Sequence, residues 1–244
     1  VSFITFSACT PTAVVTQQHS EISTEYLYFR HQEEGESGKP GGLARLWIEV
    51  ESNPEMRAPI RFAETVSGGV GEAWRATVWM ALLAAGEVLD VDPFSLRVTI
   101  EAEGAVDGPS AGALMAAAIM AGANNVPIRS DVTITGALNP DLTIGPVGGI
   151  PEKIEAALAA GKRVIGIPMG QRRVERISNK KKVDVVAMAE RMGARVALVP
   201  DIESAYALLT GQQLPVTEAL SREDMTLPPW ISDIFAGRAR STLS

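Results

Sequence analysis

The chain has 244 residues, of which 46% are hydrophobic, and a formal net charge of −7. This length and apolar content suit one well-packed domain with additions, or two small domains, and they exclude a disordered protein. The negative charge argues against a nucleic-acid partner, because phosphate binding needs clustered lysine and arginine. The two short basic runs, at residues 172–173 and 180–182, are interpreted as solvated surface.

Residues 1–42 are predicted to form an N-terminal extension, in which residues 26–29 have strand composition. Small residues precede Cys9, as at the end of a lipoprotein signal, but no basic segment stands before them and the apolar stretch is short. Two compartments therefore stay open. A cytoplasmic protein is favoured, and an exported lipoprotein anchored through Cys9 is the alternative. As the lone cysteine, Cys9 excludes an intramolecular disulfide and a cysteine-based zinc site.

The following segment predicts two strands and two helices. Alternating apolar residues indicate strands over 43–51 and 96–101, each with one buried side. Residues 72–89 are rich in Ala, Leu, Trp and Met, which predicts a long helix. Residues 113–123 are apolar on every side, and a helix of this kind is normally buried at the centre of its domain.

The second half alternates short apolar runs with helical segments. Strands are predicted at 132–135, 142–147, 164–168, 184–186 and 195–200, and helices at 151–160, 172–178, 187–192 and 202–209. Short strands separated by helices indicate an α/β fold with an at least partly parallel sheet and helices packed on it. Residues 213–244 form a Pro-rich tail whose apolar cluster around Trp230 is expected to pack on its own domain or on a neighbour.

Ser110 lies in the segment Asp107-Gly-Pro-Ser-Ala-Gly112, where a tight turn leads into the apolar helix. Its small neighbours allow a substrate carbonyl to approach the hydroxyl. Backbone N–H groups of this turn, those of Gly108 and Ser110, are candidate donors to a developing oxyanion. The alternative is a purely structural role, because serine is a favoured residue at a helix N-cap.

Lys153 follows the Gly148-Gly149 turn, 43 positions after Ser110, and lies in the first turn of the helix predicted at 151–160. The helix dipole and the neighbouring apolar face both disfavour the ammonium form, so they lower the pKa of the lysine toward the working pH. A neutral amine can then take the proton of a serine hydroxyl. The alternative is an ordinary exposed helix residue.

Other catalytic constellations are not visible in the sequence. The two histidines, His19 and His31, are far in sequence from Ser110, which argues against a Ser-His-Asp triad. Residues 35–40 resemble a phosphate loop only superficially, because Pro40 stands where a Ser or Thr would hold magnesium. The sequence therefore predicts no ATPase motif, no cofactor and no metal site.

The segment around Ser110, Thr135-Gly136 and the segment Gly145–Lys153, in this order, resemble the proteolytic domain of Lon proteases, peptidase family S16. The resemblance covers residues 43–212. It implies that Ser110 is the nucleophile, that Lys153 is the general base, and that the Thr135 hydroxyl orients the lysine. It also implies an α/β fold like domain 2 of ribosomal protein S5, with a mixed sheet and packed helices, and a homo-oligomer such as a hexameric ring.

The chain departs from full-length Lon proteases in several ways. It shows no ATPase motif, it carries Glu101 and Glu103 but no histidine ahead of Ser110, and no acidic residue follows Gly136 in the segment 137–139. The expected activity is that of an ATP-independent serine endopeptidase that forms an acyl-enzyme with unfolded proteins or peptides, alone or with a separate ATPase partner. The alternative is a non-catalytic Lon-like scaffold or a phosphate-binding relative of the same fold.

Overall fold

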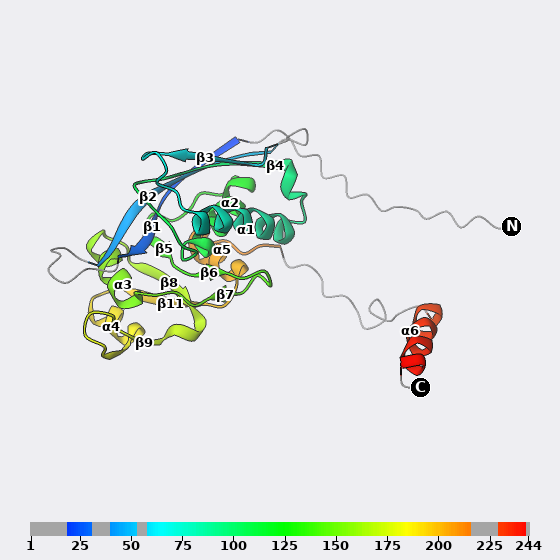
Figure 1. Cartoon of the computed structure of the whole chain (residues 1–244). Helices are drawn as coiled ribbons and strands as arrows, with labels where there is room; N and C mark the ends of the chain where they lie inside the picture. The colour runs from blue at the N-terminus through cyan, green and yellow to red at the C-terminus, as the bar shows by residue number, and fades with distance from the viewer. Residues whose placement is uncertain (1–18, 31–39, 53–57, 216–228, 243–244) are drawn as a thin grey trace. The chain divides into compact units, whose positions relative to one another are not determined.

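The computed structural model describes residues 19–30, 40–52, 58–215 and 229–242 (Figure 1). Cys9 and residues 35–39, discussed above, lie outside these ranges. The chain divides into two units, Val1–Gln213 and Leu214–Ser244. The described helix of the second unit is α6 (Pro229–Thr242). Within the described ranges, no helix combines the length and the apolar character that crossing a bilayer requires.

The first sheet has four strands in the order β1-β2-β4-β3. Strand β1 (His19–Phe29) pairs antiparallel with β2 (Gly41–Ser52), and β2 pairs antiparallel with β4 (Leu96–Ala102). Strand β3 (Ile60–Glu64) runs parallel to β4 and makes the sheet mixed. The buried side chains of β2 include those that the alternating pattern predicts: Leu46, Ile48 and Val50.

Strand β1 corrects the boundary drawn at residue 42, because it pairs with β2 along its whole length. Its side chains Ile22, Tyr26 and Leu27 are buried. The described part of residues 1–42 therefore belongs to the sheet, and the expected boundary falls inside β2.

Helix α2 (Gly112–Ala123) is buried along nearly all its length, as its apolar composition predicts. It packs against α1 (Glu72–Leu89) and against the inner face of strands β1 and β2 (Figure 1). Small residues allow this close approach. A Cβ atom on Gly122 would lie 2.6 Å from Cγ2 of Val50, so glycine lets the helix backbone rest directly on the sheet.

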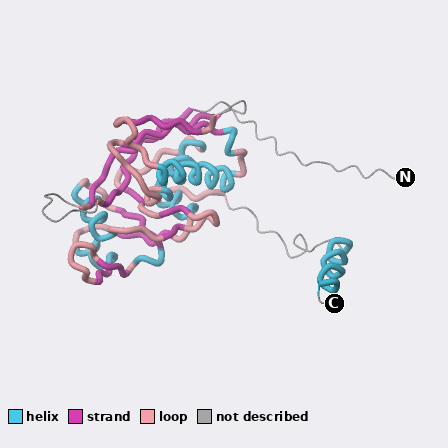
Figure 2. Tube along the Cα trace, in the orientation of Figure 1, coloured by secondary structure: helices cyan, strands magenta, loops and turns pink. Residues whose placement is uncertain are grey.

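The second sheet consists of three parallel strands in the order β11-β8-β5. They are β5 (Val132–Ile134), β8 (Val164–Pro168) and β11 (Arg195–Val199). The helices between and after them are α3 (Ile150–Ala159), α4 (Val185–Arg191) and α5 (Ile202–Thr210). Figure 2 shows strands and helices interleaved through this part of the chain, which is the mixed α/β architecture that the sequence predicts.

Shorter elements complete the first unit. Two antiparallel pairs are β6 (Ala137–Leu138) with β7 (Ile144–Gly145) and β9 (Arg173–Glu175) with β10 (Lys182–Asp184). Two 3-10 turns are η1 (Pro93–Ser95) and η2 (Met169–Gln171).

Two predicted elements of this region are wrong. The helix expected at 172–178 is a strand, because Val174 pairs across from Val183 in the β9–β10 hairpin. The strand expected at 184–186 is the start of α4. Asp184 is its N-cap, and its carboxylate accepts hydrogen bonds from the N–H groups of Val186 and Ala187.

Candidate active site

Ser110 lies two residues ahead of the first residue of α2. The N-cap position is held by Ala111, and no side chain caps the helix. The hydroxyl of Ser110 therefore does not cap helix α2, which was the structural alternative. Instead, Oγ of Ser110 accepts a hydrogen bond from Nζ of Lys153 at 3.0 Å.

The turn before Ser110 is held against helix α1. Gly108 has a φ of +99°, a backbone conformation that favours glycine. The Oδ1 atom of Asp107 accepts hydrogen bonds from the N–H of Gly108 at 2.8 Å and from the N–H of Trp74 at 3.0 Å. Because Trp74 lies in the first turn of α1, the carboxylate joins the serine turn to that helix end.

Lys153 enters the site from the first turn of α3. The helix is preceded by Gly149, which has a φ of +68° and on which a Cβ atom would lie 2.5 Å from Cδ2 of Phe29. The lysine side chain is buried, with a residue exposure of 2%. Its Nζ donates both to Ser110 Oγ and, at 3.1 Å, to Oγ1 of Thr135.

Thr135 follows β5 and connects the lysine to the backbone of the serine. Its Oγ1 donates a hydrogen bond to the carbonyl oxygen of Ser110 at 3.1 Å, and the N–H of Gly136 donates to the same oxygen at 2.8 Å. Since the hydroxyl proton of Thr135 is used in this way, its lone pairs face Nζ of Lys153. One threonine therefore positions both the serine backbone and the lysine amine.

The surroundings of Lys153 favour its neutral form. Burial lowers the pKa of Lys153 from 10.5 to about 8. Among the described residues, no carboxylate forms an ion pair with it. The adjacent carboxylate, that of Glu152, accepts a hydrogen bond from the N–H of Ile177 at 3.1 Å. A buried amine without a counter-ion is suited to accept a proton.

Ser110 and Lys153 line a pocket of about 190 Å³. A second pocket, of about 350 Å³, shares part of this lining, so the two adjoin. The shared residues are Tyr26, Tyr28, Phe29, Val106 and Asp107. Burial raises the pKa of Tyr26 to about 12, and its protonated hydroxyl donates to the carbonyl oxygen of Glu103 at 3.0 Å. The end of β1 and the segment 103–107 thus form the two sides of a cleft that leads to the serine.

The two backbone groups expected to bind an oxyanion differ in availability. The N–H of Gly108 donates to Oδ1 of Asp107 and is therefore occupied, contrary to expectation. Aspartate forms such a local bond readily when its carboxylate folds back onto a turn. The N–H of Ser110 has no hydrogen-bond partner among the residues that the structure describes.

Comparison with known proteins finds similarity to Lon proteases over part of the chain. Residues 91–198 match the family model of the Lon protease (S16) C-terminal proteolytic domain. The chain is 29% identical over 178 residues to the archaeal Lon protease of Pyrococcus abyssi, covering 68% of this chain and 18% of that protein. It is 32% identical over 159 residues to the Lon protease of Escherichia coli (strain K12), covering 60% of this chain and 20% of that protein.

A third relative matches a shorter stretch. The Lon protease of Trichlorobacter lovleyi is 40% identical over 87 residues, which are 34% of this chain and 11% of that protein. The chain thus spans between 11% and 20% of the length of these three relatives. Residues 91–198, which carry Ser110, Thr135 and Lys153, belong to the family of Lon protease C-terminal proteolytic domains.

Proposed function

We propose that the chain is a serine endopeptidase in which Ser110 and Lys153 act as a catalytic dyad through an acyl-enzyme. Membership of a Lon proteolytic-domain family supports a serine-type peptidase. The observation that supports the dyad is the 3.0 Å hydrogen bond between Ser110 Oγ and the buried amine of Lys153, which has no ion-pair partner among the described residues. Nucleophile and base at this distance are the arrangement that acyl transfer requires.

Acylation begins when Oγ of Ser110 attacks the carbonyl carbon of the scissile peptide bond. The neutral amine of Lys153 takes the hydroxyl proton as the C–O bond forms. The carbonyl oxygen becomes an oxyanion, for which the N–H of Ser110 is the candidate donor. The lysine ammonium then gives its proton to the leaving amine, the C–N bond breaks, and the acyl group remains on Ser110.

Deacylation uses the same base. Lys153 takes a proton from water, the resulting hydroxide attacks the ester carbon, and the proton returns to Oγ of Ser110 as the product acid leaves. Thr135 contributes by positioning, since it binds both the amine and the carbonyl oxygen of Ser110. Fixing the two groups before substrate arrives lowers the entropic part of the barrier.

We propose unfolded proteins or peptides as the substrates, cleaved without ATP. The cleft beside Ser110 is bounded by the end of β1, and its pockets of about 190 and 350 Å³ suit an extended segment better than a folded domain. A separate ATPase that unfolds substrates is a possible partner under this proposal, as the family resemblance implies.

Cleavage of fluorescently labelled casein tests the proposal. Ser110→Ala is expected to lower the rate by about 10³-fold or more, because removing a nucleophile abolishes covalent catalysis. Ser204→Ala, on α5, is the matched control and should cleave at the wild-type rate. Added ATP should change neither rate. Equal cleavage rates for wild type and Ser110→Ala would contradict the proposed dyad.

A further inference from the structure

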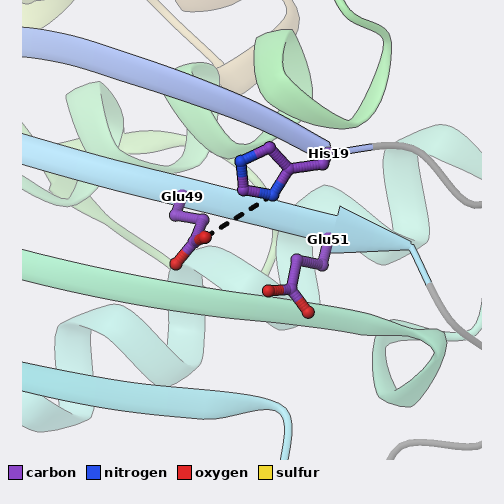
Figure 3. Close-up of side chains that lie close together, drawn as sticks. All are labelled: His19, Glu49 and Glu51. Carbon is purple, nitrogen blue, oxygen red and sulfur yellow. Dashed lines mark ion pairs between the residues drawn. The ribbon is translucent and has the colours of Figure 1, made fainter.

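A group of metal-ligand side chains lies on the outer face of the four-stranded sheet. It is at the opposite end of β1 from the residues that line the Ser110 pocket. It consists of His19 on β1 with Glu49 and Glu51 on β2 (Figure 3). One ligand atom from each residue lies within 4.8 Å of the other two. The strand register produces this grouping, because His19 is directly opposite Glu51 and Glu49 is on the same face two residues away.

The charges around this group are unbalanced. Glu21 is directly opposite Glu49, and like charges at such a cross-strand position are destabilising. Arg97 on β4 compensates one carboxylate through an ion pair with Glu51 at 3.2 Å. Together, the carboxylates of Glu21, Glu49 and Glu51 and the guanidinium of Arg97 carry an excess of two negative charges, which one divalent cation would offset.

The neighbouring residues already form the outer contacts that metal ligands usually need. Nδ1 of His19 lies 3.5 Å from Oε1 of Glu49, on the side of the ligand group. The other ring nitrogen, Nε2, lies 3.5 Å from Oε1 of Glu21. When Nδ1 binds a metal, the Nε2–H group is therefore placed to donate a hydrogen bond to the Glu21 carboxylate. Arg97 holds Oε2 of Glu51 and leaves Oε1 for coordination. Second contacts of this kind orient the ligands of known metal sites.

We propose that His19, Glu49 and Glu51 bind a divalent first-row transition metal of the zinc type, with water completing its coordination. One imidazole nitrogen with two carboxylates favours zinc over magnesium or calcium, which prefer oxygen ligands alone. The ion would tie the first residue of β1, a strand at the sheet edge, to the end of β2. Metal binding at this site does not depend on the proposed peptidase activity.

Isothermal titration of untagged, chelator-treated full chain with ZnCl₂ tests the site. Wild type is expected to bind one ion. His19→Ala should abolish that binding, and Glu49→Gln and Glu51→Gln should weaken it. Glu21→Gln should lower the affinity about 10-fold or more, as for a residue that orients a ligand.

Controls separate this site from other donors in the chain. His31→Ala and Cys9→Ser should keep the wild-type affinity, as should Glu101→Gln, which removes a carboxylate from β4 outside the ligand set. Ser110→Ala should also bind zinc normally, which distinguishes failure of this site from failure of the dyad. Excess MgCl₂ should not compete. Unchanged zinc binding by His19→Ala, or no zinc binding by folded wild type, would overturn the proposal.

Discussion

At the scale of single residues, the protonation of Lys153 is expected to control activity. Burial lowers its pKa to about 8, and only the neutral amine can accept the proton of Ser110. The kcat/KM for a peptide substrate should therefore rise about tenfold per pH unit below 8 and level off above it. Stopped assays between pH 6 and 10 measure this. His19→Ala should show the same profile, and a flat wild-type profile from pH 6 to 9 would contradict the assignment.

The same residue should lower the stability of the fold. The pKa of Lys153 is 10.5 in the unfolded reference and about 8 when folded, so the unfolded chain binds more protons between these values. The free energy of unfolding therefore rises with pH from 8 to 10.5, and below 8 the whole cost, up to about 3 kcal/mol, is present. Lys153→Met removes this cost but also loses two hydrogen bonds.

Lys153→Met is therefore expected to be inactive yet more stable than wild type at pH 7, by about 1–3 kcal/mol. The difference should shrink as the pH rises from 8 through 10.5, because the wild-type lysine then becomes neutral in the unfolded state as well as in the folded one. Urea unfolding at pH 7 and at pH 10 measures the two stabilities. A variant less stable than wild type at pH 7 would show that the amine's hydrogen bonds outweigh its burial cost.

At the scale of secondary-structure elements, the site depends on where α2 and α3 begin. The start of α3 requires Gly149, because its φ is +68° and an added Cβ would lie 2.5 Å from Phe29. Gly149→Ala should destabilise the fold by about 1–3 kcal/mol and reduce kcat by moving Lys153. Gly170→Ala is the control, since an added Cβ meets nothing within 4 Å there and the residue lines neither site pocket. Thermal melts and casein cleavage compare the two, and equal effects would contradict this explanation.

The sequence predicts most of the helices, and the turns that carry Ser110 and Lys153, because their signals are local. The turns around Ser110 and Lys153, and the apolar helix between 113 and 123, each depend on neighbouring residues. Strand β1 is harder to predict because polar side chains occupy part of its buried face. Ser20 and Thr24 are 8% and 6% exposed, so the alternation of apolar residues is hidden.

The remaining errors concern contacts between distant residues. The hairpin of β9 and β10 forms through pairing between two strands, which no local pattern predicts. Its charged sequence by itself favours a helix. Likewise His19 and Glu51 are far apart in sequence, and only the register of β1 on β2 brings them together. The sequence signal for that group is the spacing by two residues of His19 and Glu21, and of Glu49 and Glu51.

At the scale of the whole molecule, we expect the chain to self-associate, as the family resemblance implies. Helix α1 supports this, because Trp79 and Leu83 lie one turn apart and are 39% and 43% exposed. Association would remove this apolar surface from water. Sedimentation velocity should show an oligomer for wild type and a shift toward monomer for Trp79→Ser. Phe94→Ser, an exposed aromatic outside α1, is the control, and a monomeric wild type would contradict the expectation.

The division into two units predicts that the first folds and functions alone. Ser110, Lys153 and the residues of both site pockets lie within residues 1–213. Deleting 214–244 should leave the melting temperature of this unit and the cleavage of a short peptide unchanged. Deleting 202–244 is the contrasting variant, because it removes α5, whose Ile202 and Leu209 are fully buried and which packs on α2.

That longer deletion should prevent folding, since it opens the core beside the helix that follows Ser110. Calorimetry and peptide hydrolysis measure both truncations. If deleting only 214–244 lowers the melting temperature, the second unit contributes to the stability of the first. If it lowers peptide cleavage without a change in melting temperature, the tail acts on substrate or on assembly, and sedimentation of the truncated chain decides between these two roles.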